Sequence, residues 1–255
     1  MNQTIDIMKD RIAQILMDNK PSIYLFGSVV LEDFKHGWSD IDILCLTKSK
    51  ITDVQANQLL HLRQALVEEY QNPHFRLFEG AILSLQEFIH GTQKTVYWGT
   101  SGEKITDQYH FDVFSMMELL DSGRLLHGDE VKDHFAHPSQ ESIIQAVVKH
   151  YKAIRKYAVT TDRSLYSAGW MLDIARCIYT LRTGRIIAKT QAGKWALDNK
   201  LVPDAEVMKK VIRIREQPIP HKNDPAVLNW LETLGEHIQR FADVLEKEVQ
   251  AASKV

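Results

Sequence analysis

The sequence predicts an α+β protein, with a mixed sheet and helices in the first half and an all-helical second half. Two observations carry this prediction. Short apolar runs bounded by turn residues are confined to the first half of the chain. Helical periodicity of apolar residues dominates the second half. We therefore expect a first domain over residues 1–135 and a helical domain over residues 136–255.

The first half alternates helical patterns with short strand-like runs. Ile5, Met8 and Ile12 have the spacing of one helix face, and Pro21 follows where that helix should end. The expected elements are, in order, a helix at 4–18, a strand at 23–26, a short helical turn at 29–36, a strand at 41–46, a helix at 54–70, a strand at 75–85, an irregular stretch at 91–110 and a helix at 111–126.

The second half reads as a series of helices separated by glycine and proline. The breaks fall at Thr183-Gly184, at Pro203-Asp204 and between Gln217 and Pro225. The expected helices are 141–158, 166–182, 190–199, 204–216 and 225–249.

Composition indicates an ordinary soluble protein. Of 255 residues, 44% are hydrophobic and 25% charged, and the formal net charge is −2, which argues against a nucleic-acid binder that depends on a large basic patch. Cys45 and Cys177 form no C-x-x-C pair, so we expect a reduced, cytoplasmic protein without a disulfide framework. No apolar run approaches the length of about 18 residues that a membrane helix needs.

Two aspartates interrupt the apolar run that ends at Leu46. Residues i and i+2 of a strand face the same side, so Asp40 and Asp42 should lie side by side and repel one another. A divalent cation would offset this repulsion, and carboxylate oxygens suit Mg²⁺. The alternative is that the pair simply flanks the start of a strand after Ser39.

A Gly-Ser pair ends the preceding apolar run. Gly27 and Ser28 follow a strand, where a helix start would offer backbone N–H groups and a hydroxyl to a phosphate. A phosphate site next to a carboxylate pair is typical of Mg²⁺-dependent nucleoside triphosphate chemistry.

The pattern FGS…SDIDIL resembles the signature of the nucleotidyltransferase superfamily with the polymerase-beta-like fold. This resemblance implies a third carboxylate on a neighbouring strand, and Glu79 in FRLFEGAILSL is the candidate. Glu79 could be the base that takes the proton of an attacking hydroxyl, a metal ligand, or both. The alternative for Glu79 is a surface acid on an edge strand.

The stretch MLDIARCIYTLRTGRIIAKTQAGKWAL, residues 171–197, resembles the helical domain of the aminoglycoside adenylyltransferases that modify streptomycin and spectinomycin. The resemblance implies that Arg176 and Lys189 contact the phosphates of ATP, where two cations would stabilise charge on leaving pyrophosphate. The alternatives are a surface arginine on a helix and an ordinary solvated lysine.

This chain departs from that family where the drug would bind. The family's G-D-E-R-N stretch corresponds here to RSLYSAGW, residues 163–170, which contains no acid. A family tryptophan would fall near Ser101, and Trp98 is close to that place but out of register. The reaction type is therefore better supported than the acceptor.

Acidic and aromatic residues between positions 97 and 118 are candidates for acceptor binding. An aminoglycoside is a polycation, so its binding site should be acidic and could include a stacking ring. The candidates are Trp98, Glu103, Asp107 and Asp112, with Glu118 in the same stretch. The alternative is that these acids lie on solvated faces and that the tryptophan packs in the core.

These observations together favour Mg²⁺-dependent transfer of AMP from ATP to a hydroxyl of a small molecule, with release of pyrophosphate and with an aminoglycoside antibiotic as the favoured acceptor, hence a role in antibiotic resistance. The alternatives are a lincosamide, another small molecule or a protein hydroxyl as in toxin–antitoxin systems. A non-catalytic nucleotide-binding module and an RNA-directed enzyme are further alternatives. We expect a monomer or a homodimer, with no membrane partner.

Overall fold

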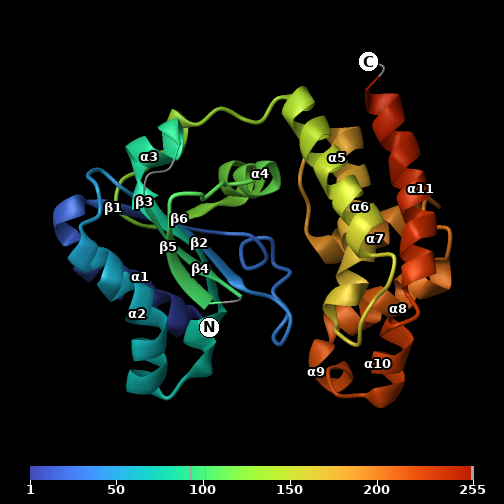
Figure 1. The fold of residues 1–255 in the computed structure, drawn as a ribbon, viewed down its shortest axis with the longest axis horizontal. Coiled ribbons are helices and arrows are strands. Elements are labelled where there is room, and N and C mark those ends of the chain that lie inside the picture. Colours follow the sequence, from blue (N-terminus) through green and yellow to red (C-terminus); the bar gives the residue numbers. More distant parts are fainter. Residues whose placement is uncertain (92–93, 101, 254–255) are drawn as a thin grey trace. The chain divides into compact units, whose positions relative to one another are not determined.

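The computed structural model describes residues 1–91, 94–100 and 102–253 and divides into two compact units (Figure 1). Unit 1 comprises Met1–Val30, Asp40–Phe111 and Glu118–Ala136. Unit 2 comprises Leu31–Ser39, Asp112–Met117 and His137–Val255. This division assigns two short segments of the predicted first domain to unit 2, and the predicted boundary between residues 135 and 136 stays a prediction.

Unit 1 is built on a mixed sheet whose described strands have the order β5-β4-β3-β2-β1-β6. The strands are β1 (Pro21–Phe26), β2 (Ile41–Thr47), β3 (Phe78–Ser84), β4 (Thr95–Gly99), β5 (Gly102–Thr106) and β6 (Arg124–His127). Strands β2 and β3 pair in parallel, whereas the other neighbours are antiparallel. The parallel pair lies at the centre of the sheet, and its first residues carry the acidic motif.

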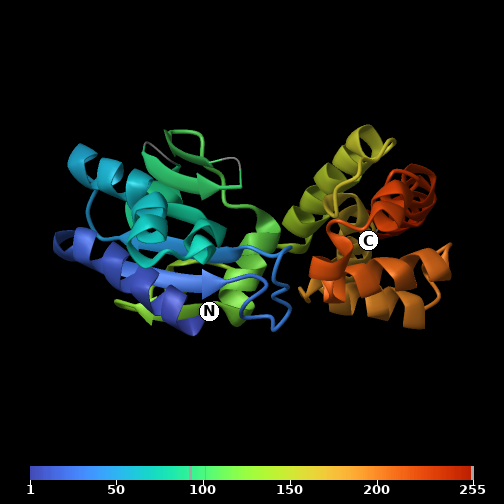
Figure 2. The same cartoon turned by 90° about the horizontal axis from the view of Figure 1, so that it is seen from below.

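Helices accompany the sheet in unit 1. They are α1 (Asn2–Ile15), η1 (Met17–Asn19), α2 (Asp53–Tyr70), η2 (Pro73–Leu77), α3 (Leu85–His90) and η3 (Lys132–His134). Helix α4 (Val113–Ser122) is divided between the units, because its residues up to Met117 are assigned to unit 2 and those from Glu118 to unit 1. Helix α2 begins with a capping box formed by Thr52 and Gln55, which fixes its first turn. Helices α1 and α2 lie side by side (Figures 1 and 2). Helix α2 covers the sheet face that carries Trp98, because the Trp98 indole donates to the Leu59 carbonyl.

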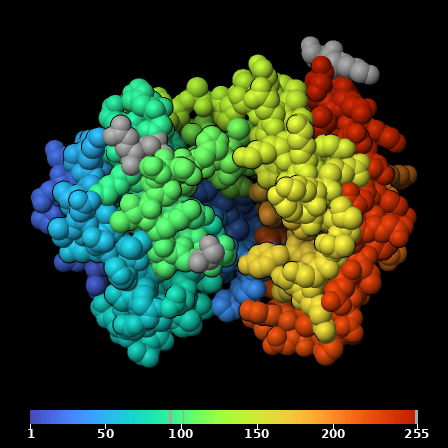
Figure 3. Space-filling model, viewed as in Figure 1, coloured from blue at the N-terminus to red at the C-terminus, as the bar shows by residue number. Residues whose placement is uncertain are grey.

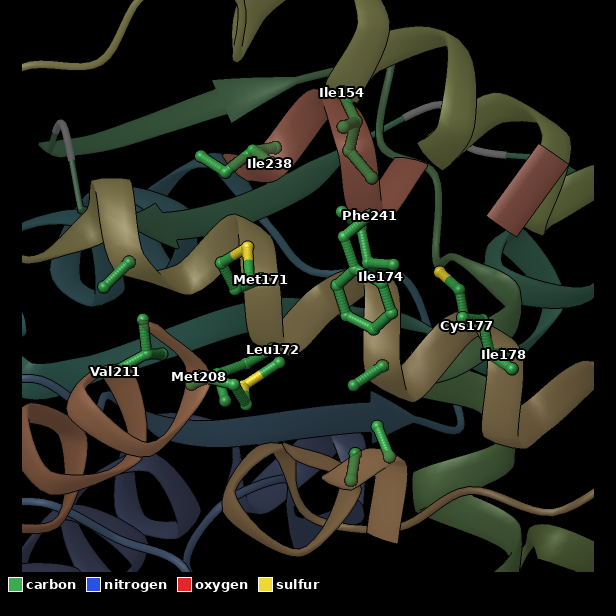
Figure 4. Close-up of a cluster of buried hydrophobic side chains, with 14 of the residues drawn as sticks. Ile154, Met171, Leu172, Ile174, Cys177, Ile178, Met208, Val211, Ile238 and Phe241 are labelled. Carbon is green, nitrogen blue, oxygen red and sulfur yellow. The ribbon is translucent and has the colours of Figure 1, made fainter. Parts of the chain in front are cut away.

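Unit 2 is helical in its long C-terminal segment. Its helices are α5 (Gln140–Tyr157), α6 (Tyr166–Thr183), α7 (Lys189–Asp198), α8 (Ala205–Glu216), α9 (Pro218–His221), α10 (Pro225–Leu231) and α11 (Gly235–Ala252). Helix α6 supplies much of the core, and its buried side chains pack with those of the other helices (Figure 4). In the space-filling view of Figure 3, α5 (yellow) lies against α11 (red), and α6 also contacts α11.

The predicted α+β class, with a mixed sheet followed by helices, is confirmed. The predicted helical turn at 29–36 is wrong, because these residues form no helix and Glu32 among them adopts a left-handed backbone. The stretch expected to be irregular holds the hairpin of β4 and β5, and the helix expected at 111–126 ends at Ser122 and is followed by β6. The helix expected at 225–249 is two helices, α10 and α11.

None of the helices in the described part of the chain is both long and apolar enough to cross a membrane.

Candidate active site

The Gly-Ser pair and the aspartate pair of unit 1 form one local structure. Gly27 has φ +68°, and a Cβ at this position would lie 2.1 Å from Oδ2 of Asp42. Only glycine therefore lets the Asp42 carboxylate approach the backbone this closely. The Ser28 N–H donates to the Asp42 carboxylate, and the Ser28 hydroxyl donates to the Asp40 carbonyl at 3.2 Å.

These contacts correct the local argument for a phosphate site at Gly27 and Ser28. No helix begins there, since the chain continues in turns after β1. The Ser28 N–H and hydroxyl already donate hydrogen bonds, to the Asp42 carboxylate and to the Asp40 carbonyl. The glycine and serine thus hold Asp42 in position, and their contact with a nucleotide remains a prediction.

Asp42 and Glu79 are direct neighbours in the parallel pair of strands β2 and β3. Cross-strand partners share one face of a sheet, so both carboxylates emerge on the same side. Ile41 and Ile43 are buried on the other face, as predicted for a strand with an acidic and an apolar side. The structure thus brings two of the predicted site residues together, with Asp40 two positions before Asp42.

Negative charge accumulates around Asp42. Burial raises the pKa of Asp42 well above its ordinary value, and the charges of Glu118, Glu79 and Asp40 raise it further. A divalent cation bound by these oxygens would offset that repulsion, so the donor set fits Mg²⁺. Among the described residues, no three histidine, cysteine, aspartate or glutamate side chains form a ready-made metal site.

Glu79 is held by a tyrosine on the neighbouring strand. The Tyr97 hydroxyl donates to Oε1 of Glu79 at 2.9 Å. Burial and the charge of Glu79 raise the pKa of Tyr97 to about 12, so the phenol keeps its proton and remains a donor at neutral pH. The edge-strand alternative for Glu79 is wrong, because β3 lies between β2 and β4.

Glu118 is an acidic residue whose place the sequence reasoning missed. It is buried on α4, and its charge raises the pKa of Asp42 more than Glu79 or Asp40 does. The sequence grouped it with the acids of an acceptor site instead. The available signal was its apolar surroundings in VFSMMELLDS, where a charged residue is unexpected in a helix with so few polar positions.

The candidates for acceptor binding have other partners in the structure. Trp98 is fully buried, and its indole bonds to Leu59, which supports the core alternative. Glu103 accepts from Nε of the buried Arg63 at 2.8 Å. Asp112 accepts from the backbone of Phe114 and Ser115 and so caps α4.

Two positions of that stretch remain. Asp107 is exposed in the turn after β5. Ser101, where the family tryptophan would fall, lies outside the described residues.

In unit 2, the two predicted phosphate-binding cations share one carboxylate. The Lys189 ammonium lies 2.8 Å from Oδ1 of Asp173, and the Arg176 guanidinium lies 3.9 Å from the same oxygen. The Arg176 guanidinium also lies over the Phe114 ring, 5.5 Å from its centroid. The side chains of Lys189 and Arg176 are 32% and 16% exposed, so neither is a freely solvated surface residue.

Asp173 was also missed by the sequence reasoning. Burial raises the pKa of Asp173, but the charges of Lys189 and Arg176 outweigh burial and hold this pKa below its ordinary value. Its carboxylate is therefore ionised at neutral pH. The available signal was an acid one helical turn before Arg176, on the same face of an otherwise apolar helix.

The families that match this chain agree with this geometry. Residues 3–87 match the family described as nucleotidyltransferase domain, a range that contains Gly27, the aspartate pair and Glu79. The site and the fold therefore define an enzyme of the nucleotidyltransferase class. Residues 135–224 match the family described as aminoglycoside adenylyltransferase, C-terminal domain, a range that contains Arg176 and Lys189. The chain is thus a nucleotidyltransferase that resembles the aminoglycoside adenylyltransferases, as the two sequence motifs predicted.

A solved structure shares the fold over nearly the whole chain. It is the spectinomycin adenyltransferase AAD(9) from Enterococcus faecialis with ATP and spectinomycin, with a TM-score of 0.67 and 17% identity. The similarity covers 96% of this chain and 99% of that one. A likeness at this identity concerns the fold. Among curated proteins, none matches the sequence.

Proposed function

We propose that the protein transfers AMP from ATP to a hydroxyl of a small molecule and releases pyrophosphate, with an aminoglycoside-type antibiotic as the acceptor. The observation that carries the proposal is the contact of Gly27 with Asp42, beside Glu79 on the adjacent strand. This acidic centre needs a cation rather than packing to explain it. The match of the second half to the C-terminal domain of aminoglycoside adenylyltransferases supports the choice of acceptor.

In the proposed reaction the acceptor oxygen attacks the α-phosphorus of ATP, and the bond from this phosphorus to the oxygen of the leaving pyrophosphate breaks. Asp40 and Asp42 would hold Mg²⁺, which when bound offsets charge on the triphosphate. Glu79 takes the proton of the acceptor hydroxyl, and the hydrogen bond from Tyr97 orients its carboxylate.

The remaining residues bind the phosphates. We assign the backbone of Gly27 and the backbone and hydroxyl of Ser28, which also contact the aspartate motif, to the β- and γ-phosphates. Arg176 and Lys189 stabilise the negative charge that develops on leaving pyrophosphate, because a cation interacts more strongly with that charge than with the ground state. The pair they form with Asp173 places both cations beside one another.

The identity of the acceptor has the least support of any part of the proposed reaction. AAD(9) was solved with spectinomycin, so spectinomycin and streptomycin are the first compounds to try. In residues 163–170, however, this chain has no acid, and the neighbouring Asp162 accepts from Ser164 and Ser167 at the start of α6. Lincosamides and protein hydroxyls are therefore the second candidates.

Mass spectrometry of a drug panel tests the proposal. The protein is incubated with ATP, Mg²⁺ and each of spectinomycin, streptomycin, other aminoglycosides and lincosamides, and the products are weighed. One compound should gain one AMP, and chelation of Mg²⁺ with EDTA should stop the gain. Asp42→Asn should abolish transfer while the protein stays folded, whereas Asp10→Asn on the exposed face of α1 should leave it unchanged. Near wild-type turnover in Asp42→Asn would overturn the metal assignment.

A cytoplasmic location, a role in drug resistance and a monomeric or homodimeric state are part of the same proposal. The location and the role in resistance follow from the proposed reaction on a drug inside the cell. Expression in a susceptible bacterium should raise the inhibitory concentration of the modified drug, and Asp42→Asn should not.

A further inference from the structure

We propose that Asp173 is a positioning residue, which holds the Lys189 ammonium and the Arg176 guanidinium together for the phosphates of the nucleotide. This inference rests on the proposed function, in which both cations contact ATP. The inference adds Asp173 to the two cations but gives it a different role. A carboxylate repels phosphate, so Asp173 is not expected to contact the nucleotide itself.

The geometry shows one oxygen serving two cations. Asp173 lies on α6 one turn before Arg176, and its Oδ1 is 2.8 Å from Nζ of Lys189 and 3.9 Å from Nη2 of Arg176. Lys189 is the first residue of α7, so the carboxylate ties the start of that helix to α6. Without Asp173, two like charges would lie close together in a partly buried place and would repel one another.

The surroundings favour ionised side chains with fixed orientation. The Phe114 ring lies under the Arg176 guanidinium, at 5.5 Å from its centroid, and restricts its rotation. The His150 ring packs against the same Phe114 ring, with the centroids 4.9 Å apart, and burial lowers the pKa of His150. The imidazole is therefore neutral at pH 7 and adds no third positive charge to the group.

A lysine needs such a partner more than an arginine does. Its ammonium is carried on a flexible four-carbon stem, and the free side chain samples many rotamers. A bond to Asp173 restricts Lys189 before the nucleotide arrives, so less entropy is lost when the charge on pyrophosphate develops. Because Asp173 repels phosphate, its effect should be on the transition state rather than on binding of ATP.

Steady-state kinetics with the acceptor identified by the drug panel test this inference. The carboxylate is changed in Asp173→Asn, which keeps its shape, and in Asp173→Glu, which keeps its charge. We expect Asp173→Asn to lower kcat about tenfold, while the KM for ATP stays the same or falls because a repulsive charge is gone. Asp173→Glu should recover part of kcat. Asp198→Asn, exposed near the end of α7, is the matched control and should behave as wild type.

A purely structural role of the ion pair gives a different result. It would lower the Tm of Asp173→Asn but leave kcat of the folded protein at the wild-type value, and that outcome overturns the inference. If Asp173→Asn does not fold, Asp173→Glu decides: a lowered kcat at an unchanged Tm supports positioning, and a wild-type kcat overturns it.

The two proposals fail in different ways. Wild-type protein that adenylylates nothing overturns the proposed function. Active wild type with a weak Lys189→Ala variant and a fully active Asp173→Asn variant overturns only the role of Asp173.

Discussion

Asp33 and Arg215 form a buried ion pair across 182 positions of sequence, with Nη2 of Arg215 3.3 Å from Oδ2 of Asp33. The side chains are 6% and 5% exposed. The Thr190 N–H donates to the same Asp33 oxygen at 3.2 Å, and the Arg215 guanidinium lies 5.3 Å from the centroid of Trp38. This pair fastens the segment Leu31–Ser39 to the helices of unit 2, and in the chain this segment joins Ser28 to Asp40.

Breaking the pair should destabilise the protein strongly. Arg215→Met removes one partner of the buried Asp33 charge and leaves the Lys35 ammonium, whose Nζ lies 3.2 Å from Oδ1 of Asp33. The expected loss in the free energy of unfolding is therefore about 3 kcal/mol, the lower end for a broken buried pair. Urea denaturation measures it. Arg213→Met, exposed on the same helix, should change the free energy little, and the double variant Asp33→Asn/Arg215→Met should recover part of the loss. A loss below about 1 kcal/mol would contradict a stabilising role for the pair.

The same pair makes stability depend on pH. Burial raises the pKa of Asp33, but hydrogen bonds from Thr190 and the charge of Arg215 outweigh it and bring the pKa below its ordinary value of 3.8. A carboxyl with a lowered folded pKa contributes its stability above the unfolded pKa and loses it as pH falls through the folded pKa. The difference in unfolding free energy between wild type and Asp33→Asn should therefore be constant above about pH 5 and shrink below about pH 4. Urea titrations from pH 7 to pH 3 check it.

The sequence predicted the residues of the motifs better than the contacts that these residues make. Asp40, Asp42 and Glu79 were found because an acid in an apolar strand is a local signal, and the parallel pairing of β2 and β3 places Asp42 next to Glu79. Gly27 and Ser28 were found by spacing, and their contact with a nucleotide stays a prediction, but their contacts with the aspartate motif were not foreseen. The close approach of Gly27 to Asp42 depends on tertiary structure, and no pattern along the chain reports it.

The missed features all depend on distant partners. The roles of Asp173 and Glu118 depend on contacts with residues that are distant in the sequence. The hairpin of β4 and β5 was predicted as irregular because glycines interrupt its sequence. Trp98 was misassigned because a large aromatic near a motif suits a stacking role and a core role equally, and only burial separates the two. Periodicity identified the C-terminal helices, whose apolar faces repeat regularly.

Gly27→Ala should abolish AMP transfer. Its Cβ would lie 2.1 Å from the Asp42 carboxylate, so the side chain must move away from its place, and the positive φ adds backbone strain of about 1 kcal/mol. Gly184→Ala is a matched control, because its φ of +65° is similar and a Cβ there meets nothing within 4 Å. Both variants should lose similar stability in thermal unfolding, but only Gly27→Ala should lose turnover. Equal activity in the two variants would show that the contact with Asp42 is dispensable.

Glu79→Gln separates binding of ATP from proton transfer. Glutamine keeps the size of the side chain and its carbonyl can still accept from the Tyr97 hydroxyl, but an amide cannot take a proton from an acceptor hydroxyl. We expect turnover to fall about 10²-fold or more, while calorimetry shows ATP binding close to wild type. Tyr97→Phe removes only the hydrogen bond to Glu79 and should lower turnover by a smaller factor, since the carboxylate stays but is less well oriented. If Glu79→Gln transfers AMP at the wild-type rate, Glu79 is not the base. If Glu79→Gln is inactive but the turnover of Tyr97→Phe equals that of wild type, Tyr97 has only a packing role.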